Sequence, residues 1–218
     1  MKRLYVVVEG QTESEFIKSV VSPYLLQFSI YITPIVIHTS RSQRGGMTSY
    51  NHLRNEVSRL LKSGKDDFVV TTFIDFYRIP EVPGKEKWES ITIDNDRVRV
   101  MRKCIDEEIG DRRFFSYIQL YEFEALFFAN DNGFAKYFTD KQISETADII
   151  AKYPNPEDIN GGMETSPSKR ILKIFPNYDK VVFGNVLALE VGIDAMLDKC
   201  QGFREWIEEI KKRCIGKQ

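Results

Sequence analysis

Apolar and polar residues form alternating blocks along the first part of the chain, and these blocks predict strands separated by helices. Continuous apolar runs rich in β-branched residues are typical of strands buried on both faces of a parallel sheet. Strand patterns cover residues 4–8, 30–38, 67–75 and the start of 113–128, where the strand runs into a helix. Apolar residues at helical spacing cover residues 13–27, 50–63 and 95–109. The repeated strand–helix units predict an α/β fold with helices around a mostly parallel sheet.

Two local signals refine this pattern. Thr12 and Glu15 match the T-x-x-E capping box that starts many helices. Pro34 lies inside the second predicted strand. Because proline cannot donate a hydrogen bond to a sheet ladder, this strand is predicted at an edge of the sheet.

From about residue 131 onward the pattern no longer predicts strands. Helical patterns cover residues 143–153, 168–175, 182–197 and 203–213. A long loop with several prolines and glycines, YPNPEDINGGMETSPSK, separates the first two of these helices. We therefore expect an α/β core at residues 1–130 and a helical C-terminal part at residues 131–218, packed together as one unit.

Composition narrows the class of protein. The chain has 218 residues, of which 42% are hydrophobic and 29% charged, with a formal net charge of -1. Its overall charge does not attract nucleic acid, so any such contact needs a local basic patch. Three cysteines without a C-x-x-C pair argue against a disulfide framework and favour a cytoplasmic protein. The sequence has no apolar run near the roughly 18 residues of a membrane helix and no signal-peptide pattern at its start, so we expect no membrane association.

Acidic residues follow several of the predicted strands. Glu9 follows the first strand, Asp75 ends the third, and Glu122 and Glu124 follow the fourth. In the common strand order 2-1-3-4, these carboxylates would meet in one crevice at the carboxyl edge of the sheet. A divalent cation would offset their repulsion, and oxygen ligands favour Mg²⁺ or Mn²⁺. Alternatively, each acid caps a turn or pairs with a lysine, and Glu122 and Glu124 cannot both face the site from one helix.

Basic residues could hold a phosphate near these acids. Lys169 and Arg170 lie in the first turns of a predicted helix, where backbone N–H groups also attract anions. Lys180 is a further candidate, and Arg41 and Arg44 lie in a glycine-bearing polar loop. The alternative is that these side chains form ordinary solvated helix and loop surface.

The stretch VVVEGQTE resembles the opening of a TOPRIM domain, the module of topoisomerases, primases and nucleases of the overcoming-lysogenization-defect type. In that family a glutamate after the first strand and a D-x-D after the third bind Mg²⁺ for phosphodiester chemistry. Glu9 matches the glutamate, and Asp75 matches the first aspartate. Tyr77 stands in place of the second aspartate, so the resemblance implies that Glu122 or Glu124 supplies the further acid.

A larger set of motifs resembles a bacterial family of unknown function with a TOPRIM-like, Rossmann-like fold. The segments VEGQTE, FIDFYRIP, YEFEALFF, PEDINGG, SPSKRI, YDK and FREW carry this resemblance over nearly the whole chain. As a set, these motifs are specific for the family, but they say less about the reaction that its members carry out.

The resemblance implies a Mg²⁺- or Mn²⁺-dependent phosphodiesterase, most simply a nuclease acting on nucleic acid. Glu9 and Asp75 would hold the metal, with Glu122 or Glu124 completing the metal shell or acting as the base, and Lys169, Arg170 or Lys180 would hold the phosphate. Defence-associated relatives further imply a role against phage beside an ATPase partner protein. The alternative hypothesis is a catalytically inactive scaffold or regulatory module that binds a partner protein.

Overall fold

The computed structural model describes residues 2–37, 47–63, 67–159, 162 and 164–216. Its sheet consists, among these residues, of β1 (Lys2–Val8), β2 (Ile30–Val36), β3 (Phe68–Asp75), β4 (Phe114–Phe115) and β5 (Ile118–Gln119). The strand order is β2-β1-β3-β4, β5 also pairs with β3, and every pair is parallel. The predicted α/β fold with a mostly parallel sheet is confirmed, and β2, which contains Pro34, lies at an edge as predicted.

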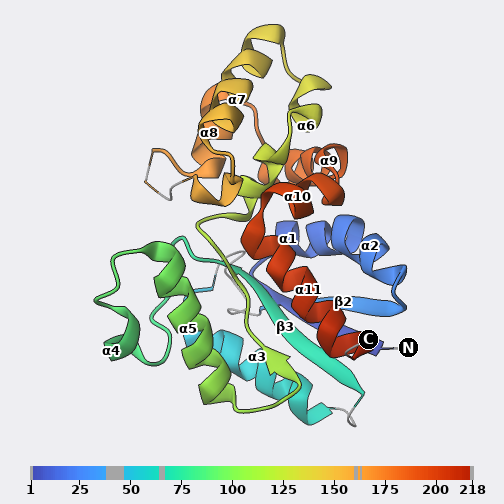
Figure 1. Cartoon of the computed structure of the whole chain (residues 1–218), viewed down its shortest axis with the longest axis vertical. Coiled ribbons are helices and arrows are strands. Elements are labelled where there is room, and N and C mark those ends of the chain that lie inside the picture. The colour runs from blue at the N-terminus through green and yellow to red at the C-terminus, as the bar shows by residue number, and fades with distance from the viewer. Residues whose placement is uncertain (1, 38–46, 64–66, 160–161, 163, 217–218) are drawn as a thin grey trace.

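Helices cover both faces of this sheet (Figure 1). The first part of the chain contributes α1 (Gln11–Phe16), the π-helical turn η1 (Ile17–Val21), α2 (Ser22–Leu26), α3 (Tyr50–Ser63), α4 (Lys85–Trp88) and α5 (Asp94–Ile109). The second part contributes the 3₁₀ helices η2 (Phe123–Ala129) and η3 (Pro156–Asp158), and α6 (Asn132–Ala135), α7 (Asp140–Lys152), α8 (Pro167–Ile174), α9 (Lys180–Val191), α10 (Ile193–Lys199) and α11 (Gln201–Ile215).

The sheet separates two hydrophobic cores. Along β1, Leu4, Val6 and Val8 belong to the core under α1 and α11, whereas Val7 belongs to the core under α3 and α5. This follows from the strand geometry, in which successive side chains point to opposite faces. This two-sided burial explains why the sequences of the central strands β1 and β3 are continuous apolar runs.

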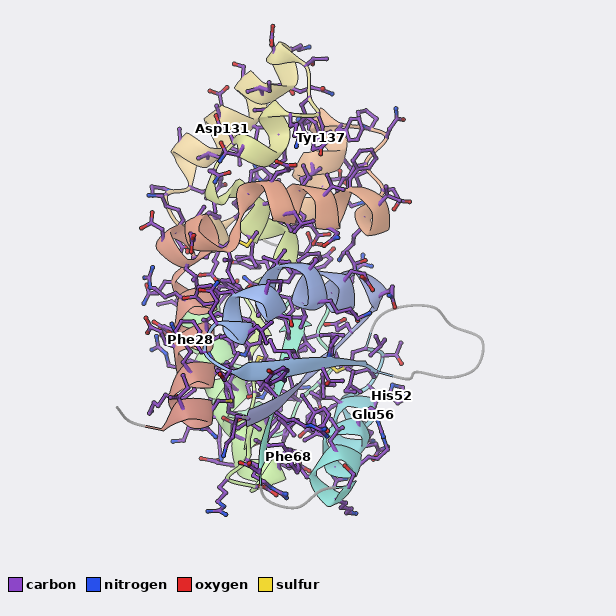
Figure 2. All side chains as sticks on the ribbon, turned by 90° about the vertical axis from the view of Figure 1, so that its right-hand side faces the viewer. Phe28, His52, Glu56, Phe68, Asp131 and Tyr137 are labelled. Carbon is purple, nitrogen blue, oxygen red and sulfur yellow. The ribbon has the colours of Figure 1, made fainter. Side chains whose placement is uncertain are left out.

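The C-terminal helices pack on the first core. In Figure 1, α6 to α9 lie above the sheet and α11 returns alongside β3. Trp206 of α11 is fully buried, stacks on Tyr117 with ring centroids 5.0 Å apart, and donates its indole N–H to Thr71 Oγ1 at 3.1 Å. Figure 2 shows the same arrangement from the side, with Tyr137 in the upper helices and Phe68 in the lower part.

Three sequence-based details differ from the structure. The predicted capping box is wrong, because the first helix begins at Gln11 after Gly10, and Glu15 instead accepts a hydrogen bond from Gln11 Nε2 at 2.7 Å. The single helix predicted over 13–27 is divided by η1. The fourth strand is divided into β4 and β5, because Thr72 Oγ1 exchanges hydrogen bonds of 2.6 and 2.7 Å with the backbone of Tyr117.

The helix predicted over 182–197 also divides, because Gly192 adopts a left-handed φ of 78° between α9 and α10. Helices close to the other three predicted C-terminal segments are present as α7, α8 and α11. Among the described residues, no helix is long and apolar enough to cross a membrane.

We expect Trp206→Ala to lower the free energy of unfolding by about 3–5 kcal/mol, because it removes a fully buried aromatic side chain that joins α11 to the sheet. Chemical unfolding followed by circular dichroism measures this change. Val182→Ala, at a side chain that is 59% exposed, is the control and should change stability by less than about 0.5 kcal/mol. A loss of only the helical part in Trp206→Ala, with the sheet intact, would contradict the packing of the chain as one unit.

Candidate active site at the carboxyl edge of the sheet

Glu9 lies directly after β1 and joins two strands through its carboxylate. Oε1 accepts a hydrogen bond from the Asp75 backbone N–H at 2.9 Å, and Oε2 accepts one from the Met47 N–H at 3.3 Å. Burial raises the pKa of Glu9, while these hydrogen bonds oppose the increase. The side chain therefore stabilises the ends of β1 and β3 and places a negative charge between them.

Asp75 is the last residue of β3, and its carboxylate reaches the start of η2. Oδ1 accepts a hydrogen bond from the Phe123 backbone N–H at 3.0 Å. Burial raises the pKa of Asp75 well above its usual value, the ammonium group of Lys180 opposes this, and the charges of Glu9 and Glu13 add to it. Asp75 thus lies in the electrostatic field of both neighbouring glutamates.

Glu124, in η2, is fully buried and pairs with a lysine from α9. Lys180 Nζ lies 3.2 Å from Glu124 Oε1 and also 3.2 Å from Glu13 Oε1. Burial raises the pKa of Glu124 to about 7, with Lys180 opposing the increase. Burial lowers the pKa of Lys180, but the surrounding carboxylates outweigh it and raise that pKa overall.

We call Glu9, Glu13, Asp75, Glu124 and Lys180 the edge cluster. It gathers four carboxyl groups around one ammonium group. Glu13 was not predicted as a site residue, although it lies within VEGQTE. The available signal was its position four residues after Glu9, in the first turn of α1, where it is buried.

Two buried polar groups in this region lack hydrogen-bond partners among the described residues. One is Glu124, whose Oε2 has neither a hydrogen bond nor the ion pair that Oε1 forms with Lys180. The other is the hydroxyl of Tyr178, whose pKa is raised by burial and by the charge of Glu124. Because buried polar atoms are nearly always satisfied, these two groups indicate a place where a ligand or ion could bind.

Glu122 lies outside the edge cluster. Its Oε2 accepts a hydrogen bond from the Ser168 backbone N–H at 2.9 Å, in the first turn of α8. Of the two acids in YEFE, Glu124 therefore faces Lys180, while Glu122 faces the start of α8, the helix end predicted to hold phosphate. The predicted metal shell of Glu9, Asp75 and Glu122 is not assembled as such, and no group of three or more His, Cys, Asp or Glu residues in the described ranges has the geometry of a metal site.

The basic candidates are separated in the structure. Lys180 belongs to the edge cluster, and Lys169 is exposed on α8. Arg170 holds the preceding loop, since Nε donates to the Thr165 carbonyl at 2.7 Å and Nη2 donates to the Tyr153 hydroxyl at 3.2 Å. The two remaining candidates lie outside the described residues: Arg41 and Arg44.

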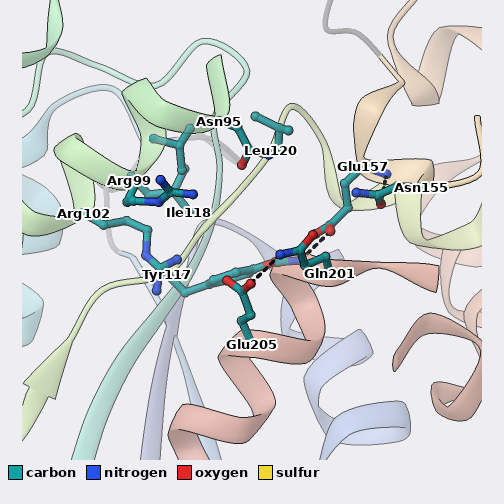
Figure 3. Close-up of a pocket in the computed structure, with 12 residues that line it drawn as sticks. Asn95, Arg99, Arg102, Tyr117, Ile118, Leu120, Asn155, Glu157, Gln201 and Glu205 are labelled. Carbon is teal, nitrogen blue, oxygen red and sulfur yellow. Dashed lines mark hydrogen bonds between the residues drawn. The ribbon is translucent and has the colours of Figure 1, made fainter. Parts of the chain in front are cut away.

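A small cavity lies between α5 and the start of α11 (Figure 3). Glu157 points toward the first turn of α11, where it accepts hydrogen bonds from the backbone N–H groups of Gly202 at 2.6 Å and Phe203 at 3.1 Å. The cavity has a volume of about 70 Å³, which is too small for a nucleotide. Glu157 is therefore a helix-capping acid outside the edge cluster.

The fold and the edge cluster define a class: an α/β protein with buried acids at the carboxyl edge of a parallel sheet. The chain belongs to a family described as a domain of unknown function, DUF4276, whose model matches residues 8–211. This confirms the resemblance to a family of unknown function. The matched range contains the whole edge cluster.

Two further comparisons concern individual proteins. The comparison with curated proteins finds no match. Among solved structures, the chain is similar to the C-terminal region of the Burkholderia pseudomallei OLD protein, with 14% sequence identity and a TM-score of 0.46 over 97% of this chain and 99% of that one.

The raised pKa of Glu124 predicts a pH dependence of stability. Its carboxyl group has a usual pKa of 4.5 but a pKa of about 7 in the folded protein, so the folded state binds more protons between these values. Proton binding by Glu124 therefore stabilises the folded state fully below pH 4.5, and this stabilisation is lost as the pH rises through about 7. The free energy of unfolding decreases by roughly 1–3 kcal/mol as a result.

We therefore expect the free energy of unfolding of the wild type to decrease more steeply between about pH 5 and pH 8 than that of Glu124→Gln. Urea titrations at a series of pH values measure both slopes. Glu205→Gln, at an exposed position of α11, is the control and should retain the wild-type slope. Equal slopes in the wild type and Glu124→Gln would contradict a titration of Glu124 in this range.

Proposed function

We propose that the edge cluster is the active site of a metal-dependent phosphodiesterase acting on nucleic acid, a nuclease. The observation that carries this proposal is the excess of charge: Glu9, Glu13, Asp75 and Glu124 share one ammonium group at the edge where parallel sheets bind ligands. The motif resemblance to TOPRIM nucleases supports it. Through defence-associated relatives, the same resemblance connects the proposal to phage defence and an ATPase partner.

The donor set suits a hard divalent cation. All of the acids offer oxygen, which Mg²⁺ and Mn²⁺ prefer, and the buried Oε2 of Glu124 has no hydrogen-bond partner among the described residues. Glu9 and Asp75 would hold the ion, and Glu124 would lie beside it. When bound, it would supply Lewis-acid stabilisation to the phosphate oxygens.

The residues of the chain would provide the remaining steps. Glu124 has a pKa of about 7, so at neutral pH its Oε2 can accept a proton from the attacking water. Lys180 Nζ would offset the negative charge of the phosphate. Glu9 accepts two backbone hydrogen bonds. It would therefore hold the ends of β1 and β3 together and keep Glu9 and Asp75 close to each other.

The test is a cleavage assay on single-stranded DNA, RNA and plasmid with Mg²⁺, Mn²⁺ or EDTA. We expect Glu9→Gln, Asp75→Asn and Glu124→Gln each to lower the rate about 100-fold or more, because each removes a negative charge or a proton acceptor. Glu157→Gln is a matched control, since Glu157 is also buried but caps α11. Equal activity in the three edge-cluster variants and in this control would overturn the proposal.

A second candidate function is a non-catalytic scaffold, and the position of Lys180 favours it. Its ammonium group lies 3.2 Å from an oxygen of both Glu13 and Glu124, so it already acts as an internal counter-ion for the acids. In this case the edge cluster would join α9 to α1 and η2, and a partner protein would bind elsewhere on the fold.

Lys180→Met tests this counter-ion role, and metal binding separates the two functions. Because the Lys180 side chain is itself 39% exposed, we expect the variant to lose about 1–3 kcal/mol of stability when two buried carboxyl groups lose their cation. Chemical unfolding measures the loss, and Lys169→Met, at an exposed lysine of α8, is the control. Calorimetric titration of the folded wild type with Mn²⁺ completes the test: the nuclease predicts binding, whereas absence of both binding and cleavage supports the scaffold.

A further inference from the structure

A cleft of about 620 Å³ opens beside the carboxyl end of β3, on the side of the sheet covered by α5. Its lining begins at Phe76, directly after Asp75, and includes aromatic rings from three segments: Tyr77, Trp88 and Tyr121. The volume is in the range of cavities that hold small molecules the size of a nucleotide. The lining combines flat aromatic surface with a few polar groups, as is typical of ligand sites.

The backbone around this cleft is held in an uncommon conformation. Arg78 and Tyr121 are non-glycine residues with left-handed φ values of 59° and 62°. The Tyr77 backbone N–H donates to the Tyr121 carbonyl at 2.8 Å, which fixes the two corners to each other. Left-handed conformations of bulky residues cost about 1 kcal/mol or more and cluster at functional sites. These two strained positions lie in the segments that bring the rings of Tyr77 and Tyr121 to the cleft.

The charges of the cleft leave one cation without an acidic partner. Lys85 pairs with Glu81 at 2.6 Å and Arg97 pairs with Asp94 at 3.3 Å. Arg78 is exposed and lies over the Tyr77 ring, 5.1 Å from its centroid, and no acid pairs with it among the described residues. An arginine beside an aromatic ring offers both a planar stacking surface and a positive charge.

We infer that this cleft binds an unpaired nucleobase, so that the substrate of the neighbouring edge cluster is single-stranded nucleic acid. The inference rests on the proposed function for its link to catalysis, because Asp75 of the edge cluster and Tyr77 of the cleft are two residues apart. A base can stack on the aromatic rings that line the cleft only when one of its faces is free, and a base within a duplex has both faces covered by its neighbours. Arg78 would contact a phosphate of the same nucleotide.

Binding can be measured without cleavage. Of the two tryptophans, Trp206 is fully buried, so a ligand in the cleft should quench the fluorescence of Trp88. We expect a short single-stranded oligonucleotide to quench the Asp75→Asn protein in EDTA, and a duplex of the same length to bind at least about tenfold more weakly. Equal affinity for the two ligands would overturn the inference.

Two substitutions test the residues of the cleft in the same background. Tyr77→Ala should weaken single-strand binding about tenfold or more, whereas Tyr137→Ala, at a tyrosine that is 43% exposed on the distant helical part, should not. Arg78→Gly tolerates the left-handed φ, so it should fold at least as stably as wild type and yet bind more weakly. Unchanged binding in Tyr77→Ala and Arg78→Gly would overturn the inference.

The outcomes also separate this inference from the proposed function. Cleavage by the wild type, combined with no quenching and no effect of Tyr77→Ala, would overturn the base-binding cleft and leave the nuclease. Selective single-strand binding lost in Tyr77→Ala, combined with no cleavage by the wild type under any metal condition, would support the cleft and overturn the nuclease.

Discussion

The ion pairs of Lys180 are the interaction on which the arrangement of this fold depends. A single ammonium group at the start of α9 contacts Glu13 of α1 and Glu124 of η2. Buried carboxylates without a cation are destabilising, so Lys180 favours the packing of these segments against one another. The contact also brings the helical part of the chain to the carboxyl edge of the sheet. Fold and candidate chemistry therefore share the same charged groups.

The other two acids of the edge cluster also serve the structure. Glu9 accepts hydrogen bonds from the backbone N–H groups of Asp75 and Met47, and Asp75 accepts one from the N–H of Phe123. Removing either carboxylate would leave buried donors unsatisfied, which is costly whatever the protein does. For Asp75, the isosteric amide keeps the one accepting oxygen and removes the charge, so it separates the chemical role from the structural role. For Glu9, glutamine keeps only one of the two accepting oxygens, so this substitution also weakens the hydrogen bond from Asp75 or Met47.

Local sequence patterns predicted most of the sheet because its central strands, β1 and β3, are buried on both faces. Their apolar runs indicate a parallel sheet, and Pro34 indicates that β2 lies at an edge. The divided fourth strand could not be predicted in this way, since it depends on the Thr72 hydroxyl bonding to Tyr117, a distant residue in sequence. The same limit applies to the site. The strand-end acids were visible, but the partnership of Glu13 and Glu124 with Lys180 arises only when the helical part packs on the sheet.

Tyr77 stands in place of the second aspartate of the D-x-D pattern, and this replacement agrees with the charges around Asp75. A carboxylate at this position would add another negative charge next to Asp75, whose pKa is already raised by burial and by neighbouring acids. In this chain the position instead carries an aromatic ring, which lines the cleft on the α5 side, and its N–H bonds to Tyr121. In the proposed nuclease, Glu124 supplies the further acid from the face of the sheet opposite the cleft. The last residue of β3 thus belongs to the charged site, and the ring two residues later lines the cleft that we propose for a base.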